Sequence, residues 1–129
     1  MKNQSVKVFD VVDDEFADTL IGLGLKRNVA KTLTFLRNGE KVTSRDIEIA
    51  SNLRQPEVST AMRELENHDW VVIKEVKKPG KGRPFKTYQL DKNINTIIDH
   101  LGNQKVMESR NIMENIQKLK LMNVSRKVS

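Results

Sequence analysis

Apolar side chains recur every three or four residues along the first half of the chain, which is the spacing of a helix with one buried face. Acidic residues in a first turn, Thr43 or Ser44 as a cap, and Pro56 at the opening of a helix mark the expected starts. Asn38-Gly39 marks an end. The predicted helices cover about 13–23, 26–37, 44–51 and 55–67.

The fourth predicted helix separates its side chains into two faces. Val58, Met62 and Leu65 fall on one side and form the expected buried face. The remaining side chains are polar and are expected to face outward: Glu57, Ser59, Thr60, Arg63 and Glu64.

The pattern changes after residue 69, where β-branched and aromatic residues predict strands over about 70–76 and 85–90. The link 77–84 is rich in proline, glycine and lysine, so the two strands form a hairpin with a basic tip. From residue 92 a helical pattern returns, to about residue 122, with a broken apolar stripe that a small domain cannot wholly bury. We therefore expect a homodimer whose interface contains Ile94, Ile98, Leu101, Ile112, Ile116 and Leu119.

Composition narrows the possible functions. The net charge is +6, and the excess of lysine and arginine lies in the C-terminal half, which favours a polyanionic partner. Cysteine is absent, so disulfides and thiolate chemistry are excluded. No apolar run has the length of a membrane span, and the polar N-terminus is unlike a signal peptide, so we expect a cytoplasmic, nucleoid-associated protein without a membrane partner.

The order of elements predicts a mainly α fold with a small β-hairpin, the winged helix-turn-helix. In that fold the second helix of the pair enters the major groove of DNA. We expect this domain over 1–91 and a C-terminal helix for dimerisation, with a basic tail, over 92–129.

Five stretches carry a family resemblance. The segments 43–48, 53–59 and 62–65, followed by Trp70-Val71, resemble the helix-turn-helix of archaeal predicted transcriptional regulators, which are related to TrmB-like, ArsR-like and MarR-like proteins. The motif Lys81-Gly-Arg-Pro, with Tyr88 and Leu90 after it, resembles their wing. The resemblance covers about residues 20–91. It implies a positive φ before the first wing strand, where these families usually carry glycine and this chain has Asp69.

These patterns predict a sequence-specific regulator that binds double-stranded DNA. Arginine reads guanine, glutamine reads adenine, and hydroxyl groups bond bases or phosphates. In the recognition helix we expect contacts from Arg54, Gln55, Ser59, Thr60 and Arg63. In the wing we expect them from Lys77, Lys78, Lys81, Arg83 and Lys86. At the start of the helix pair we expect capping or phosphate contact from Thr43, Ser44 and Arg45.

Within the wing, Arg83 lies between Gly82 and Pro84, a setting that suits insertion into an A·T-rich minor groove. A solvated loop is the alternative for this segment.

Other readings of the chain remain open at this stage. A winged helix can also act as a protein-interaction or RNA-binding module within a larger complex. An enzyme is not expected, because no nucleophile, paired acid and base, or metal-ligand spacing is present, and His68 and His100 are isolated. No pattern indicates a cofactor or identifies a small-molecule effector.

Overall fold

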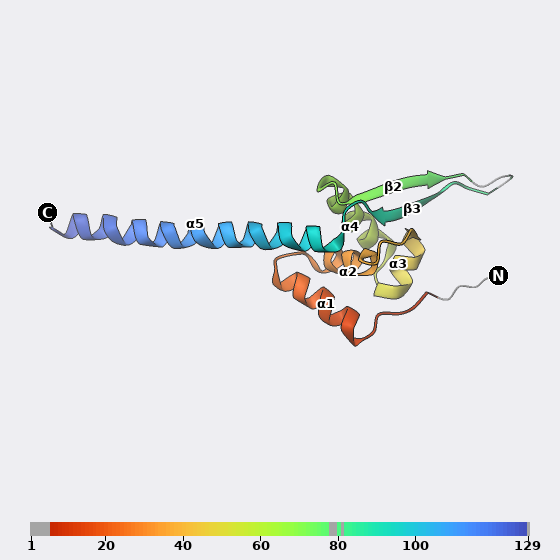
Figure 1. The fold of residues 1–129 in the computed structure, drawn as a ribbon, viewed down its shortest axis with the longest axis horizontal. Coiled ribbons are helices and arrows are strands. Elements are labelled where there is room, and N and C mark those ends of the chain that lie inside the picture. Colours follow the sequence, from red (N-terminus) through yellow and green to blue (C-terminus); the bar gives the residue numbers. More distant parts are fainter. Residues whose placement is uncertain (1–5, 78–79, 81, 129) are drawn as a thin grey trace. The chain divides into compact units, whose positions relative to one another are not determined.

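The computed structural model describes residues 6–77, 80 and 82–128, the last four without side chains. The chain divides into two compact units, one ending at Ile97 and one beginning at Ile98. In chain order the elements are α1 (Val11–Gly22), α2 (Arg27–Leu36), β1 (Val42–Thr43), α3 (Ser44–Ser51), α4 (Gln55–Asn67), β2 (Val71–Val76), β3 (Phe85–Leu90) and α5 (Ile94–Val128) (Figure 1).

These bounds confirm the predicted helices and strands to within a few residues. Two elements, β1 and α5, differ from the prediction. The sequence pattern did not predict β1, because it has only two residues and exists through its pairing with a distant strand. The second difference is the length of α5, which continues beyond residue 122 to Val128; Gly102 lies inside it, as in the predicted helix, because a glycine weakens a helix without ending it.

The core of the first unit is built around α2, whose Val29, Leu33 and Leu36 are almost completely buried. This helix packs against α1, α3 and α4. From α4 the predicted set Val58, Met62 and Leu65 is buried, which confirms the inner face of that helix. The core is completed by other side chains at or below 1% exposure, among them Ala17, Ala30, Ile47, Ala50, Ala61 and Ile97.

The three strands form one antiparallel sheet in the order β1-β3-β2. β2 and β3 are the predicted hairpin, in which Val71 is opposite Leu90 and Val76 is opposite Phe85. β1 pairs with the other edge of β3, with Val42 opposite Tyr88. Because β1 leads directly into α3, this pairing joins the hairpin to the helix pair.

The turn between α4 and β2 depends on a left-handed residue. Asp69 has a φ of 61°, as the family resemblance implied for this position. The Asp69 N–H donates to the carbonyl of Glu66, and the Trp70 N–H donates to that of Leu65. These bonds form a tight turn of three residues between the end of α4 and the start of β2, so the helix and the hairpin are closely connected in the chain.

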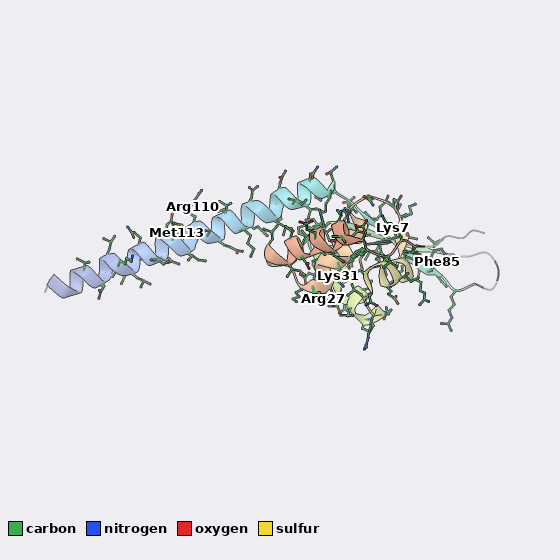
Figure 2. All side chains as sticks on the ribbon, turned by 90° about the horizontal axis from the view of Figure 1, so that it is seen from below. Lys7, Arg27, Lys31, Phe85, Arg110 and Met113 are labelled. Carbon is green, nitrogen blue, oxygen red and sulfur yellow. The ribbon has the colours of Figure 1, made fainter. Side chains whose placement is uncertain are left out.

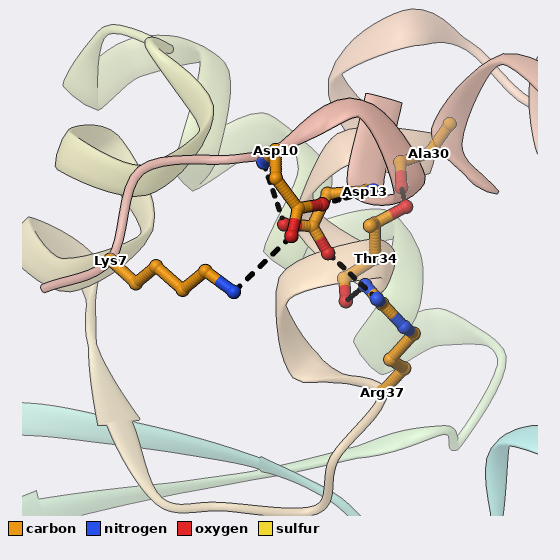
Figure 3. Close-up of polar contacts among 6 residues, drawn as sticks. All are labelled: Lys7, Asp10, Asp13, Ala30, Thr34 and Arg37. Atoms are coloured by element: carbon orange, nitrogen blue, oxygen red, sulfur yellow. Dashed lines mark hydrogen bonds and ion pairs between the residues drawn. The ribbon is translucent and has the colours of Figure 1, made fainter. Parts of the chain in front are cut away.

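The start of α1 is held by a polar network that reaches α2 (Figure 3). Asp10 caps the helix by accepting a bond from the Asp13 N–H, and the Asp13 carboxylate accepts one from the Asp10 N–H. The capping bond and the nearby Lys7 ammonium lower the pKa of Asp10 below 3.8. Asp13 also forms an ion pair of 2.7 Å with Arg37, whose guanidinium lies 4.8 Å from the centre of the Phe16 ring.

The second unit contains only the helix α5 from residue 98 onward. Between residues 106 and 124 its large apolar side chains are 48% to 67% exposed. They are Val106, Met107, Ile112, Met113, Ile116, Leu119, Leu121, Met122 and Val124. A helix with this much exposed apolar surface is unusual for a protein that remains monomeric.

Candidate nucleic-acid interface

The helix pair begins at Thr43, which caps α3. The Thr43 hydroxyl accepts a bond of 3.2 Å from the Asp46 N–H, and the Asp46 carboxylate accepts one of 3.0 Å from the Thr43 N–H. Ser44, the other candidate, instead donates its hydroxyl to Glu48. Arg45 is exposed and has no polar partner among the described residues. Thr43 is therefore a structural cap, while Arg45 is the side chain at this position that remains open to an external anion.

A short turn connects α3 to α4. Asn52 ends α3 with a φ of 58°, and the chain returns to an extended conformation at Arg54, the N-cap of α4. The Arg54 N–H donates to Oε1 of Glu57 over 2.9 Å. Glu57 thus satisfies one of the unpaired amides that every helix start leaves open.

The outward face of α4 carries four of the predicted contact residues. Gln55, Thr60 and Arg63 are exposed, and Ser59 is half-buried. The Thr60 hydroxyl donates to the Pro56 carbonyl, which leaves its oxygen lone pairs for an outside donor. Arg63 has neither an ion pair nor a hydrogen bond to any residue that the structure describes. Its guanidinium is therefore available to a partner.

The acidic residues of α4 face a different neighbour. Glu57 forms an ion pair of 3.8 Å with Arg27, and Glu64 forms one of 3.6 Å with Lys26, both from the start of α2. The Asn28 side chain adds a bond to the Glu57 carbonyl, and Figure 2 labels Arg27 and Lys31 on this helix. These exposed pairs add little stability, but they neutralise the two carboxylates that would otherwise repel phosphates.

Helix geometry explains this separation of charge. Glu57 and Glu64 are seven residues apart and lie on one line along α4. At about 100° per residue, Arg63 lies roughly a quarter turn from that line, and Gln55 and Ser59 lie farther round. The cations of α2 therefore cover the acidic edge without covering the polar face that contains Arg63.

Sequence reasoning missed Lys26 and Arg27 because the interaction joins residues about thirty positions apart. Their position at a helix start gave no signal, since cations there oppose the helix dipole. The only available signal was the uncompensated pair of carboxylates on a helix expected to approach phosphates.

The hairpin supplies a second group of cations. Lys77, Arg83 and Lys86 are exposed, and none has a polar partner within the described part of the chain. Gly80 has a φ of 82°, a backbone conformation that favours glycine. Lys78 and Lys81 lie outside the described residues, so their predicted phosphate contacts remain predictions.

Tyr88 lies at the centre of the sheet, between Val42 of β1 and Ile73 of β2. Burial raises the pKa of the Tyr88 hydroxyl, and the Glu66 carboxylate raises it further. The phenol is therefore neutral over the whole physiological range and contributes to the base of the hairpin without carrying charge.

These observations decide the fold. The chain is a winged helix-turn-helix. The helix pair α3 and α4 is followed by the hairpin β2–β3, which is the wing, and β1 completes the sheet. The predicted fold class is confirmed, including the long C-terminal helix.

Comparison with known proteins adds little to this assignment. No family model and no curated protein sequence matches the chain. Among solved structures it is similar to NadR in complex with 4-hydroxyphenylacetate, with 14% identity, a TM-score of 0.49, and coverage of 99% of this chain and 95% of NadR. It is also similar to a MepR variant from a multidrug-resistant S. aureus clinical isolate, with 21% identity, a TM-score of 0.43, and coverage of 92% and 90%. The assignment therefore depends on the elements of this chain.

The residues predicted for the dimer interface differ in their exposure. Leu101 is 6% exposed, and Ile94 and Ile98 are half-buried within the single chain. Ile112, Ile116 and Leu119 are 59%, 48% and 64% exposed. Of the six predicted residues, only Ile112, Ile116 and Leu119 therefore expose much of their apolar surface.

Two kinds of site are absent from the described residues. No cluster of three or more histidine or acidic side chains there could hold a metal ion. Among the helices of that same part of the chain, none combines the length and the apolar character needed to cross a bilayer.

Proposed function

We propose that this winged helix-turn-helix protein binds double-stranded DNA as a homodimer and regulates transcription. The supporting observation is the arrangement of charge on α4. Its acidic edge is neutralised by Lys26 and Arg27, while its outward face presents Arg63 without a partner among the described residues. In this arrangement α4 enters the major groove, where Arg63 and Gln55 read base edges.

The wing contributes a second set of cations to the proposed interface. Lys77, Lys86 and Arg45 are exposed, and in the proposal they contact phosphates. Arg83 enters the minor groove, because a planar and weakly hydrated guanidinium is desolvated more easily there than an ammonium group. The proposed partner of α5 is a second copy, which would cover the exposed triplet Ile112, Ile116 and Leu119.

The resemblance to archaeal regulators agrees with this function and remains a prediction, as do the cytoplasmic location and the absence of enzymatic activity. The proposed domain division places the DNA-binding part at 1–91 and the dimerisation helix at 92–129.

The direct test is titration of the purified protein with random and selected duplexes at several salt concentrations. Each phosphate contact makes the slope of log K against log salt more negative by about 0.9. Lys77, Lys86 and Arg45 in the two copies of the dimer therefore predict a slope of roughly −5 or steeper. A selection from random duplexes should return one enriched sequence. Salt-independent binding, or a preference for single-stranded RNA over every duplex, would overturn the proposal.

The contribution of the wing is tested with Arg83→Lys, using Lys86→Ala as the matched control. Arg83→Lys should keep the salt slope and lose the preference for A·T-rich flanks, whereas Lys86→Ala should weaken binding to all duplexes about equally. If Arg83→Lys binds both kinds of flank as the parent does, the wing supplies only diffuse charge.

A further inference from the structure

The exposed part of α5 contains one face with a regular spacing. Ile112, Ile116 and Leu119 continue a series whose members are alternately four and three residues apart, which places them on a single stripe. The series is Lys105, Ser109, Ile112, Ile116, Leu119 and Asn123. Reversing the order of the series leaves the spacing unchanged, so the same face fits a second copy in either direction. The side chains must therefore decide the orientation.

We propose that two copies pair through this face in antiparallel orientation, with the two-fold axis midway between Ile112 and Ile116. This inference rests on the proposed dimer and specifies its geometry. In this register Ile112 meets the second copy's Ile116, and Ser109 meets the second copy's Leu119. Lys105 meets the second copy's Asn123. In every layer the two facing side chains are then compatible in size or in charge.

The small size of Ser109 supports the layer that contains it. A shallow groove runs along the flank of the stripe at this level, lined by Lys105, Val106, Ser109, Arg110, Met113, Glu114 and Gln117. Arg110 and Met113 are labelled on α5 in Figure 2. The small Ser109 side chain leaves a depression between its longer neighbours, and Leu119, at 64% exposure, is a knob of suitable size for such a hole. A parallel pair would instead place Ser109 against Ser109 and leave this depression unfilled.

Charge supports the same orientation. In a parallel, in-register pair Lys105 would meet Lys105 in an otherwise apolar seam, where like charges are poorly screened. Its one partner among the described residues is Glu108 on the same helix, 3.1 Å away, and this pair is exposed and therefore weak. The antiparallel pair separates the two ammonium groups and gives each an amide oxygen as an acceptor.

The exposed apolar side chains of α5 also favour an interface. Nine large apolar side chains of α5 are about half or more exposed. Those that flank the stripe include Val106, Met113 and Met122, which would be partly covered at the sides of the seam. Burying this apolar surface lowers the free energy, and an isolated helix has no partner surface against which to bury it.

The sign of one charge change distinguishes the two orientations. Asn123→Glu places a carboxylate opposite Lys105 in the antiparallel pair and should lower the dissociation constant of the dimer about two- to fivefold. In a parallel pair the same change places two carboxylates face to face and raises that constant. Asn123→Lys should do the opposite in the antiparallel pair, and adding Lys105→Glu to it should restore dimerisation. Sedimentation equilibrium of the full chain measures each constant, with circular dichroism as a check that α5 remains helical.

Crosslinking provides an independent test, because the chain contains no cysteine of its own. Chains with Ser109→Cys and tagged chains with Leu119→Cys are mixed and treated with a short bismaleimide. The antiparallel pair predicts that the mixed product exceeds either same-residue product at least fivefold. Same-residue products in excess, or weakening by Asn123→Glu, would overturn the antiparallel arrangement and leave the dimer intact. A chain that sediments as a monomer would overturn the dimer itself.

Discussion

The ion pair between Asp13 and Arg37 should be one of the strongest polar contributions to the stability of the first unit. Its 2.7 Å bond joins α1 to the end of α2, and the two side chains are only 16% and 22% exposed. Arg37 also donates to the Thr34 carbonyl over 2.8 Å and lies over Phe16. A hydrogen bond to a charged group contributes about 1.5–3 kcal/mol, and an exposed cation–π contact contributes about 0.5–1 kcal/mol.

We therefore expect Arg37→Met to lower the free energy of unfolding by about 2–3 kcal/mol. This is less than the roughly 3–5 kcal/mol found when a fully buried pair loses one partner, since water reaches part of this one. Asp13→Asn should cost less, because the amide oxygen can still accept the bond from the Asp10 N–H. The double variant should show a coupling energy of about 1–2 kcal/mol.

Urea denaturation of the parent, the two single variants and the double variant measures this coupling. The slope of free energy against urea must be the same for all four, so that the comparison reflects the native state. Additive losses, with a coupling below about 0.3 kcal/mol, would refute the reasoning. They would show that Arg37 acts through its apolar stem and its bond to the helix end.

Three further changes give expected outcomes of different kinds. Asp10→Asn removes a carboxyl group that titrates. Because the pKa of Asp10 is lowered in the folded state, the parent should be more stable than the variant above pH 3.8. Free energies of unfolding measured at a series of lower pH values should show that this advantage is lost as the pH falls below 3.8. Asp69→Gly should raise the free energy of unfolding by about 0.5–1 kcal/mol in urea melts, because glycine adopts a φ of 61° without strain; a loss would mean that the Asp69 side chain stabilises the turn. Leu65→Ala should cost about 2–5 kcal/mol of stability, whereas Arg63→Ala should leave melting nearly unchanged and weaken binding to the selected duplex about tenfold or more; equal destabilisation would contradict the two faces of α4.

The sequence was sufficient to predict the helices and strands that are determined by nearby residues. The bounds of α4 and β3 were predicted correctly because Pro56 at the helix start and the period-two alternation of 85–90 are signals within a few residues. The buried face of α4 followed from its spacing. The positive φ of Asp69 was inferred from the resemblance, because this backbone conformation belongs to the turn and is shared by related chains.

What the sequence could not supply depends on contacts between distant residues. The pairing of Val42 with Tyr88 creates β1 from two residues that have no strand pattern. The pairs of Lys26 with Glu64 and Arg27 with Glu57 require the packing of α2 on α4 to be known. The stripe of the C-terminal helix was predicted as one interface, whereas its members differ widely in exposure, from 6% at Leu101 to 64% at Leu119.

The pairing of α2 cations with α4 acids affects how the proposed DNA-reading surface could be transferred. A recognition helix can be treated as an independent unit and moved to another protein by itself. For this chain, that means transplanting residues 55–67 alone. Here that transplant would leave two carboxylates without counter-charges next to the phosphates of the operator. A chimaera that is to retain the target preference of the donor must therefore include the start of α2, although Lys26 and Arg27 need not read any base.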